Sequence, residues 1–122
     1  MATKLDKLCK NLEAFYIDMG SRMNNIVVLV MSEFGRRVAE NGSAGVDHGH
    51  GNCMIAMGGG IAGGQVMTQW PGLHPSQLYS GNLAITIDYR DIVAEILNRR
   101  MENNSLDLVF PNYTPTFQGI TI

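Results

Sequence analysis

The chain has 122 residues, of which 45% are hydrophobic and 16% charged, a composition typical of one globular domain. The formal net charge of −2 gives no positive field that would attract nucleic acid or an anionic membrane surface. No apolar run reaches the ~20 residues of a membrane span, and the charged amino terminus is unlike a signal peptide. The sequence as written therefore predicts a cytoplasmic protein without nucleic-acid or membrane partners.

Local patterns predict two helices and two or three strands. Leucine-rich periodicity at steps of three and four residues predicts a helix over Thr3–Met19. The apolar run Ile26–Met31 predicts a strand covered on both faces, as in a parallel sheet. Ser32–Asn52 is polar and glycine-rich, which predicts a long loop, and Cys53–Met57 predicts a second buried strand.

The rest of the chain predicts a short strand, a helix and a tail. Gln65–Thr68 precedes a turn at Trp70-Pro71-Gly72, and a helix with an apolar stripe begins at Asp88. Phe110–Ile122 reads as a proline-punctuated tail. Residues 1–122 thus predict a single α/β domain with an incomplete sheet, which either assembles with copies of itself or belongs to a larger domain.

The two cysteines and the glycine block indicate no site of their own. Cys9 and Cys53 lie in unrelated contexts, so we expect buried thiols. Residues 58–63 match the spacing G-x-G-x-x-G, but no helix pattern follows, so a flexible turn is favoured over a nucleotide site. His74, next to Pro75, is likewise interpreted as a turn residue.

The segment between Ser32 and Gly51 carries the candidate chemistry. Glu33 directly follows a predicted strand, where functional groups gather in open parallel sheets. Asp47, His48 and His50 offer oxygen and nitrogen donors that suit zinc, manganese or iron. A solvated polar loop with incidental histidines is the alternative, and spacing alone does not decide between the two.

Two arginines follow Glu33 in the same segment. The Arg36 guanidinium matches a tetrahedral phosphate or sulfate, and we favour a binding role for it. For Arg37 we favour a surface ion pair.

Several motifs together resemble one family. S-E-F-G-R, D-H-G-H-G, the glycine block and D-Y-R-D follow one another from about Leu5 to Tyr113. In this order they resemble the carboxy-terminal third of sulfatase-like proteins of the domain-of-unknown-function family DUF1501, in the alkaline-phosphatase-like superfamily. The resemblance implies a partial three-layer α/β/α fold with a mainly parallel sheet and metal ions at its strand ends.

The resemblance also implies site residues and a reaction. Glu33 matches the aspartate of the superfamily's T-x-D-H-G ligand motif, and Asp47-His48 matches a later ligand region, whereas Phe34 replaces the first motif's histidine. A divalent metal, zinc or manganese, would activate a small phosphate or sulfate ester. The resemblance further implies that full-length relatives are similar to exported periplasmic proteins and have an amino-terminal part that bears the nucleophile. We therefore expect this chain to be inactive alone.

Three hypotheses follow from the sequence. The first is the carboxy-terminal part of a metal-dependent hydrolase, with Glu33 and Arg36 as catalytic groups and a metal held by Glu33, Asp47, His48 and His50. The second is a non-catalytic α/β oligomerisation or binding module, whose partner is another copy or an amino-terminal segment. The third and weakest is a nucleotide-binding domain that uses the glycine block.

Overall fold

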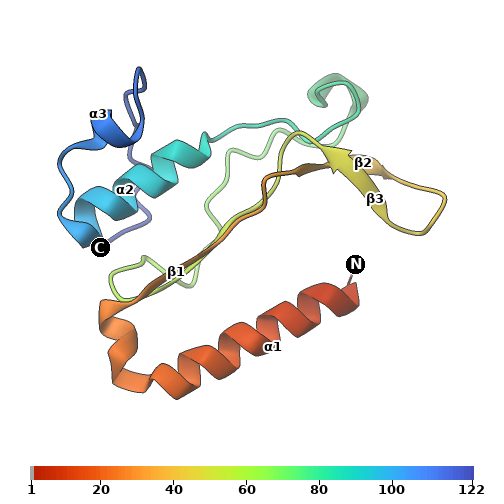
Figure 1. Cartoon of the computed structure of the whole chain (residues 1–122). Helices are drawn as coiled ribbons and strands as arrows, with labels where there is room; N and C mark the ends of the chain where they lie inside the picture. The colour runs from red at the N-terminus through yellow and green to blue at the C-terminus, as the bar shows by residue number, and fades with distance from the viewer. Residues whose placement is uncertain (1) are drawn as a thin grey trace.

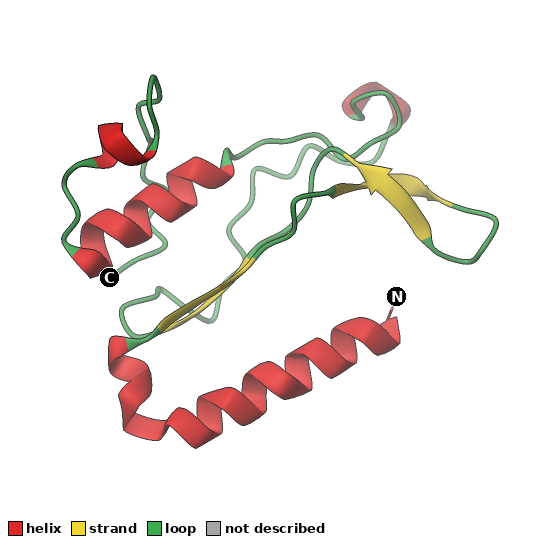
Figure 2. Cartoon of the chain, viewed as in Figure 1, coloured by secondary structure: helices red, strands yellow, loops and turns green. Residues whose placement is uncertain are grey.

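The structure, a computed structural model, describes residues 2–122 and consists of short elements joined by long extended segments (Figure 1). Two-stranded sheets lie between the helices (Figure 2). The elements in chain order are α1 (Ala2–Met19), η1 (Gly20–Asn25), β1 (Val27–Val30), β2 (Gly35–Glu40), β3 (Val46–Gly49), β4 (Ile55–Gly58), η2 (Pro75–Gln77), α2 (Tyr89–Met101) and α3 (Leu106–Val109).

The first helix confirms the predicted helix over Thr3–Met19, because α1 ends at the same residue. It leads into η1, a 3-10 helix that buries Met23. The carbonyl of Met23 accepts hydrogen bonds from the amides of Ile26 and Gly59, at 3.2 and 2.8 Å. These bonds tie η1 to one end of the first sheet, where β1 begins and β4 ends.

The sheet corrects the predicted fold class. β1 and β4 are strands close to the predicted ranges, but they pair antiparallel, with Val27 opposite Gly58 and Val30 opposite Ile55. The second sheet, β2–β3, is also antiparallel. A parallel pair requires a crossover, usually a helix, and the segment between β1 and β4 instead forms a hairpin. The expected three-layer α/β/α fold with a mainly parallel sheet was therefore wrong.

The loop predicted over Ser32–Asn52 was also wrong, because β2 and β3 form a hairpin within it. Asn41 closes the connection between the two strands. Its side-chain oxygen accepts hydrogen bonds from the backbone amides of Ser43 and Gly45. The backbone amide of Asn41 donates to the carbonyl of Gly45. An asparagine that bonds to the backbone in this way stabilises a turn. Figure 1 shows the hairpin projecting away from the other elements.

The second helix and the tail form the other end of the molecule. Asp88 caps α2, since its carboxylate accepts from the amide of Arg90 at 2.9 Å, as predicted for a helix that begins there. The tail returns along this helix and brings Ile120, which is buried, close to it. Gln65–Thr68, predicted as a short strand, forms no helix or strand in the structure.

Little of this chain is buried. Among residues 3–122 the buried apolar side chains are Met23, Ala94, Ile96 and Ile120. Cys9 and Cys53 are both exposed, so the expectation of buried thiols was wrong. Within the described part of the chain, no helix has both the length and the hydrophobicity to cross a bilayer.

Candidate functional site

The hairpin places three candidate side chains on one face. Arg36 on β2 lies directly opposite His48 on β3, and partners in an antiparallel pair point to the same side. Side chains alternate along a strand, so His50 and Phe34, each two residues away, share that side. The resulting surface of Phe34, Arg36, His48 and His50 is called the hairpin face below.

Aromatic contacts fix both imidazoles of the hairpin face. The ring of His48 stacks on Phe34 with centroids 4.2 Å apart and an interplanar angle of 12°. The ring of His50 stacks on Tyr79 at 4.7 Å and 25°. Phe34 and Tyr79 stay 45% and 62% exposed, so solvent and ligands reach this surface. The imidazoles are thus held in place while remaining accessible.

Two glycines allow the strands of the hairpin to approach closely. Gly35 and Gly49 are opposite each other in the register. A Cβ atom on Gly49 would collide with the backbone carbonyl of Arg36, and one on Gly35 would collide with that of His50. Any larger residue at either position would push Arg36 and His48 apart.

A third segment anchors the hairpin. The amide of Arg36 donates to the carbonyl of Gly51 at 2.9 Å, and the amide of Gly51 donates to the carbonyl of Leu83 at 2.8 Å. The amide of Leu83 in turn donates to the carbonyl of Arg36 at 3.2 Å. This cycle of backbone bonds holds the chain around Leu83, and with it Tyr79, beside the hairpin face.

Neither predicted carboxylate is a member of the hairpin face. Asp47 precedes His48 in the strand, so it points to the opposite side, where Asn41 donates to its carboxylate at 2.8 Å. Glu33 lies exposed in the bend between β1 and β2. Among the described residues, no three histidine, cysteine, aspartate or glutamate side chains gather closely enough to hold a metal ion. The described residues therefore do not by themselves assemble the metal site predicted from Glu33, Asp47, His48 and His50.

Other segments predicted from sequence are turns. The glycine block follows β4 as a turn without a helix start, and His74 caps η2 by accepting from the amide of Ser76 at 3.3 Å. Both agree with the predicted turns.

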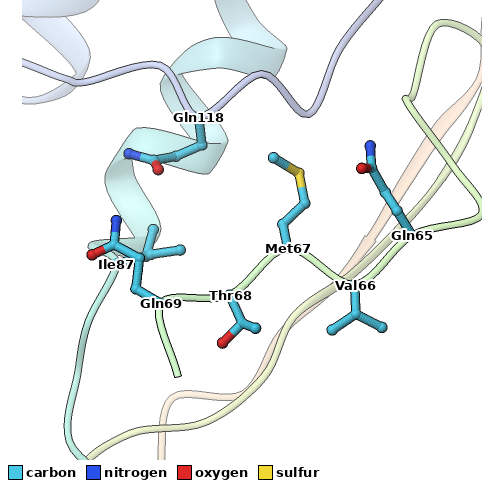
Figure 3. A pocket seen from close by; sticks show the side chains of 7 residues that line it. All are labelled: Gln65, Val66, Met67, Thr68, Gln69, Ile87 and Gln118. Carbon is cyan, nitrogen blue, oxygen red and sulfur yellow. The ribbon is translucent and has the colours of Figure 1, made fainter. Parts of the chain in front are cut away.

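A shallow hollow of about 320 Å³ lies between residues 65–69, Ile87 and Gln118. Met67 points from the extended segment toward the tail that carries Gln118, whereas Val66 and Thr68 point away (Figure 3). None of the side chains that line this hollow is a carboxylate or an imidazole. It therefore offers no acid, base or strong metal ligand, and the hairpin face remains the stronger candidate.

Two buried carboxylates on α2 escaped the sequence reasoning. Asp91 accepts from the Tyr113 hydroxyl at 2.7 Å and from the amide of Thr116 at 2.8 Å. Glu95, 2% exposed, accepts four hydrogen bonds from the tail between Gln118 and Thr121. Such carboxylates are typical of functional sites, but here every bond goes to the chain itself. Their role is to hold the tail against α2.

These contacts shift two pKa values. Burial tends to raise the pKa of Glu95, but the hydrogen bonds from Thr121, Gly119 and Gln118 together hold it below its ordinary value. The Tyr113 hydroxyl donates a hydrogen bond to Asp91, and this bond, with a smaller effect of desolvation, raises the pKa of Tyr113 to about 12. Both shifts reflect tail packing and place no reactive group near neutral pH.

Comparison with known proteins identifies the family. Residues 1–107 match the family described as protein of unknown function (DUF1501). No curated protein and no solved structure matches the sequence. The match covers the first helix, the hairpin face and all of α2, so the chain belongs to the DUF1501 family of proteins of unknown function.

Proposed function

We propose that this chain contributes an oxyanion- and metal-binding surface to a sulfatase-like hydrolase of phosphate or sulfate esters, in the alkaline-phosphatase-like superfamily. The observation that supports the proposal is the shared hairpin face of Arg36, His48 and His50. A guanidinium presents a fork of N–H donors that matches two oxygens of a tetrahedral oxyanion. Imidazole is a ligand for zinc, and the His48 and His50 side chains are exposed.

Each group has a distinct role in this proposal. Arg36 binds the non-bridging oxygens of the ester, and His48 and His50 are two ligands of a divalent metal, zinc or manganese. Such a metal, when bound, polarises the ester and lowers the pKa of the attacking water or hydroxyl. Glu33 is the candidate acid–base group, since it is exposed and precedes β2 by two residues. Asp47, bonded to Asn41 on the opposite side, supports the hairpin turn.

The chain alone is expected to be inactive. A catalytic zinc site has three protein ligands and an open position, and the hairpin face offers two imidazoles. A further ligand and the nucleophile must come from groups beyond the hairpin face. The expected activity of the isolated chain is therefore binding of metal and oxyanion without turnover.

Calorimetric titration tests this function. We expect zinc to bind the wild type and to bind the His48→Ala, His50→Ala double variant at least about tenfold more weakly, because both proposed imidazole ligands are lost. His74→Asn is the matched control, since it removes a histidine but keeps an acceptor for the turn. Equal zinc binding by the double variant and the wild type would rule out the metal role.

Titration with inorganic phosphate tests the oxyanion role separately. We expect Arg36→Ala to abolish phosphate binding and Arg37→Ala to leave it unchanged. Arg37 is adjacent in sequence but lies on the other side of the hairpin. If both variants bind phosphate like the wild type, Arg36 has no such role.

A second candidate function is assembly without catalysis. Among residues 3–122, nineteen large hydrophobic side chains are exposed, whereas four apolar side chains are buried. Exposed apolar surface of this extent marks contact with another polypeptide. Assembly in solution together with a lack of both zinc and phosphate binding would favour this function over the first.

A further inference from the structure

The accessible surface of the chain is larger than a compact monomer of this mass would have. It amounts to 8603 Å², whereas the scaling for folded monomers gives about 6,500 Å² for 13.4 kDa. The excess of about 2,100 Å² is more than the ~800 Å² that each partner buries in a standard interface. The surface is therefore large enough for a stable contact with another polypeptide.

Part of this surface is the apolar stripe of α1. No residue of the stripe is buried in the structure. Leu5 and Phe15 are 50% and 39% exposed. The spacing of the stripe alternates between three and four residues, which is the a/d pattern of a helix pair. The stripe consists of Leu5, Leu8, Leu12, Phe15 and Met19.

The charges that flank the stripe are arranged symmetrically. With the stripe at positions a and d, the g positions are Lys4, Asn11 and Asp18. Lys4 and Asp18 lie seven residues on either side of Asn11. Neither forms an ion pair with another described residue, whereas Lys10 pairs with Asp6 at 2.9 Å on the outer side of the helix. Charges at g positions set the partner and orientation of a helix pair.

We infer that two copies of this chain pair through α1, with the helices antiparallel and a two-fold axis near Asn11. In this arrangement Lys4 of each copy meets Asp18 of the other, and the two Asn11 side chains face each other. In a parallel pair the g position of one helix faces an e position of the other, so Lys4 would lie beside Cys9 of the partner and would gain no opposite charge. Only the antiparallel pair brings Lys4 and Asp18 together, so the charges select this orientation. A two-fold interface is self-complementary, and the charge pattern of α1 has this property.

Charge substitution tests the pairing by sedimentation of the full chain over a concentration series. We expect Lys4→Asp to weaken the dimer about tenfold, because like charges then meet at both ends of the pair. The double variant Lys4→Asp, Asp18→Lys restores the complementarity and should return the dissociation constant to within about twofold. Lys7→Asp makes the same charge change at an outward c position and should have little effect.

A monomeric wild type at every concentration would overturn the inference. So would a double variant that dimerises no better than Lys4→Asp alone. Far-ultraviolet circular dichroism of each variant shows that α1 remains folded, so a loss of dimer reports the interface.

Cysteine cross-linking tests the orientation independently. Cys9 occupies the e position near the proposed axis, so the two Cys9 thiols lie close together in the antiparallel pair. A short thiol cross-linker should join copies of the Cys53→Ser variant and leave the Cys9→Ser variant uncross-linked. Cross-linking through Cys53 instead would overturn the antiparallel α1 pair.

Discussion

Glu95 is the buried group on which the docking of the tail depends most directly. Its Oε1 accepts from the amide and hydroxyl of Thr121, and its Oε2 accepts from the amides of Gln118 and Gly119. Glu95→Gln keeps the shape but replaces one oxygen with a donor, so two of these four bonds are lost. A hydrogen bond to a charged group contributes roughly 1.5–3 kcal/mol. The free energy of unfolding should therefore fall by about 3–6 kcal/mol.

Urea unfolding and amide hydrogen exchange measure this effect. The variant should unfold at lower urea concentration, and the amides of Gln118, Gly119 and Thr121 should lose protection first. Glu13→Gln, an exposed glutamate on α1, is the control and should change stability by less than about 0.5 kcal/mol. Unchanged tail protection in Glu95→Gln would refute the account of tail docking.

The same carboxylate predicts a pH dependence. The pKa of Glu95 is lower in the folded chain than its ordinary value of 4.5. Its contribution to stability is therefore complete above pH 4.5 and is lost as the pH falls through the folded pKa. Stability of the wild type should decline more steeply below pH 4.5 than that of Glu95→Gln.

Three further predictions concern single residues. The pKa of Tyr113 is raised from its ordinary value of 10.0 to about 12 in the folded chain. The contribution of Tyr113 to the free energy of unfolding is therefore complete below pH 10.0 and is lost as the pH rises to about 12. Tyr113→Phe should remove the latest phase of tyrosine ionisation in the absorbance titration. Gly49→Ala should destabilise the hairpin by more than about 2 kcal/mol and expose the backbone amide of Arg36 to hydrogen exchange. Gly42→Ala is the control and should be nearly neutral, because the space around Gly42 is open. Asp88→Ala should destabilise α2 by about 1 kcal/mol in thermal unfolding, and Asp88→Asn by much less.

Both long helices were predictable because their signals are local. The three- and four-residue steps between Leu5 and Met19 give the amphipathic period of α1, and Asp88 gives the cap of α2. The apolar runs also identified β1 and β4. Their pairing direction was not predictable from those runs, because it depends on the connection between them. In that connection the Asn41 side chain closes the turn between β2 and β3, but the polar and glycine-rich composition of Ser32–Asn52 predicted a loop.

The candidate site was predictable in its residue types and less so in its grouping. His48, His50 and Arg36 stand out by composition, but the division into two faces follows from the strand register. Once β3 is recognised as a strand, alternation separates Asp47 from His48. The burial of Asp91 and Glu95 depends on the tail returning from more than twenty residues away. No local pattern reports such a contact.

Nuclear magnetic resonance of the histidine rings tests the proposed function most directly, because the chain has three histidines and two of them are the proposed metal ligands. During titration with zinc, the ring signals of His48 and His50 should shift together, while those of His74 stay in place. Subsequent addition of inorganic phosphate should shift the guanidinium signals of Arg36 ahead of those of Arg37. Zinc titration that leaves the His48 and His50 signals unmoved, or that shifts His74 to the same extent, would contradict the proposed site.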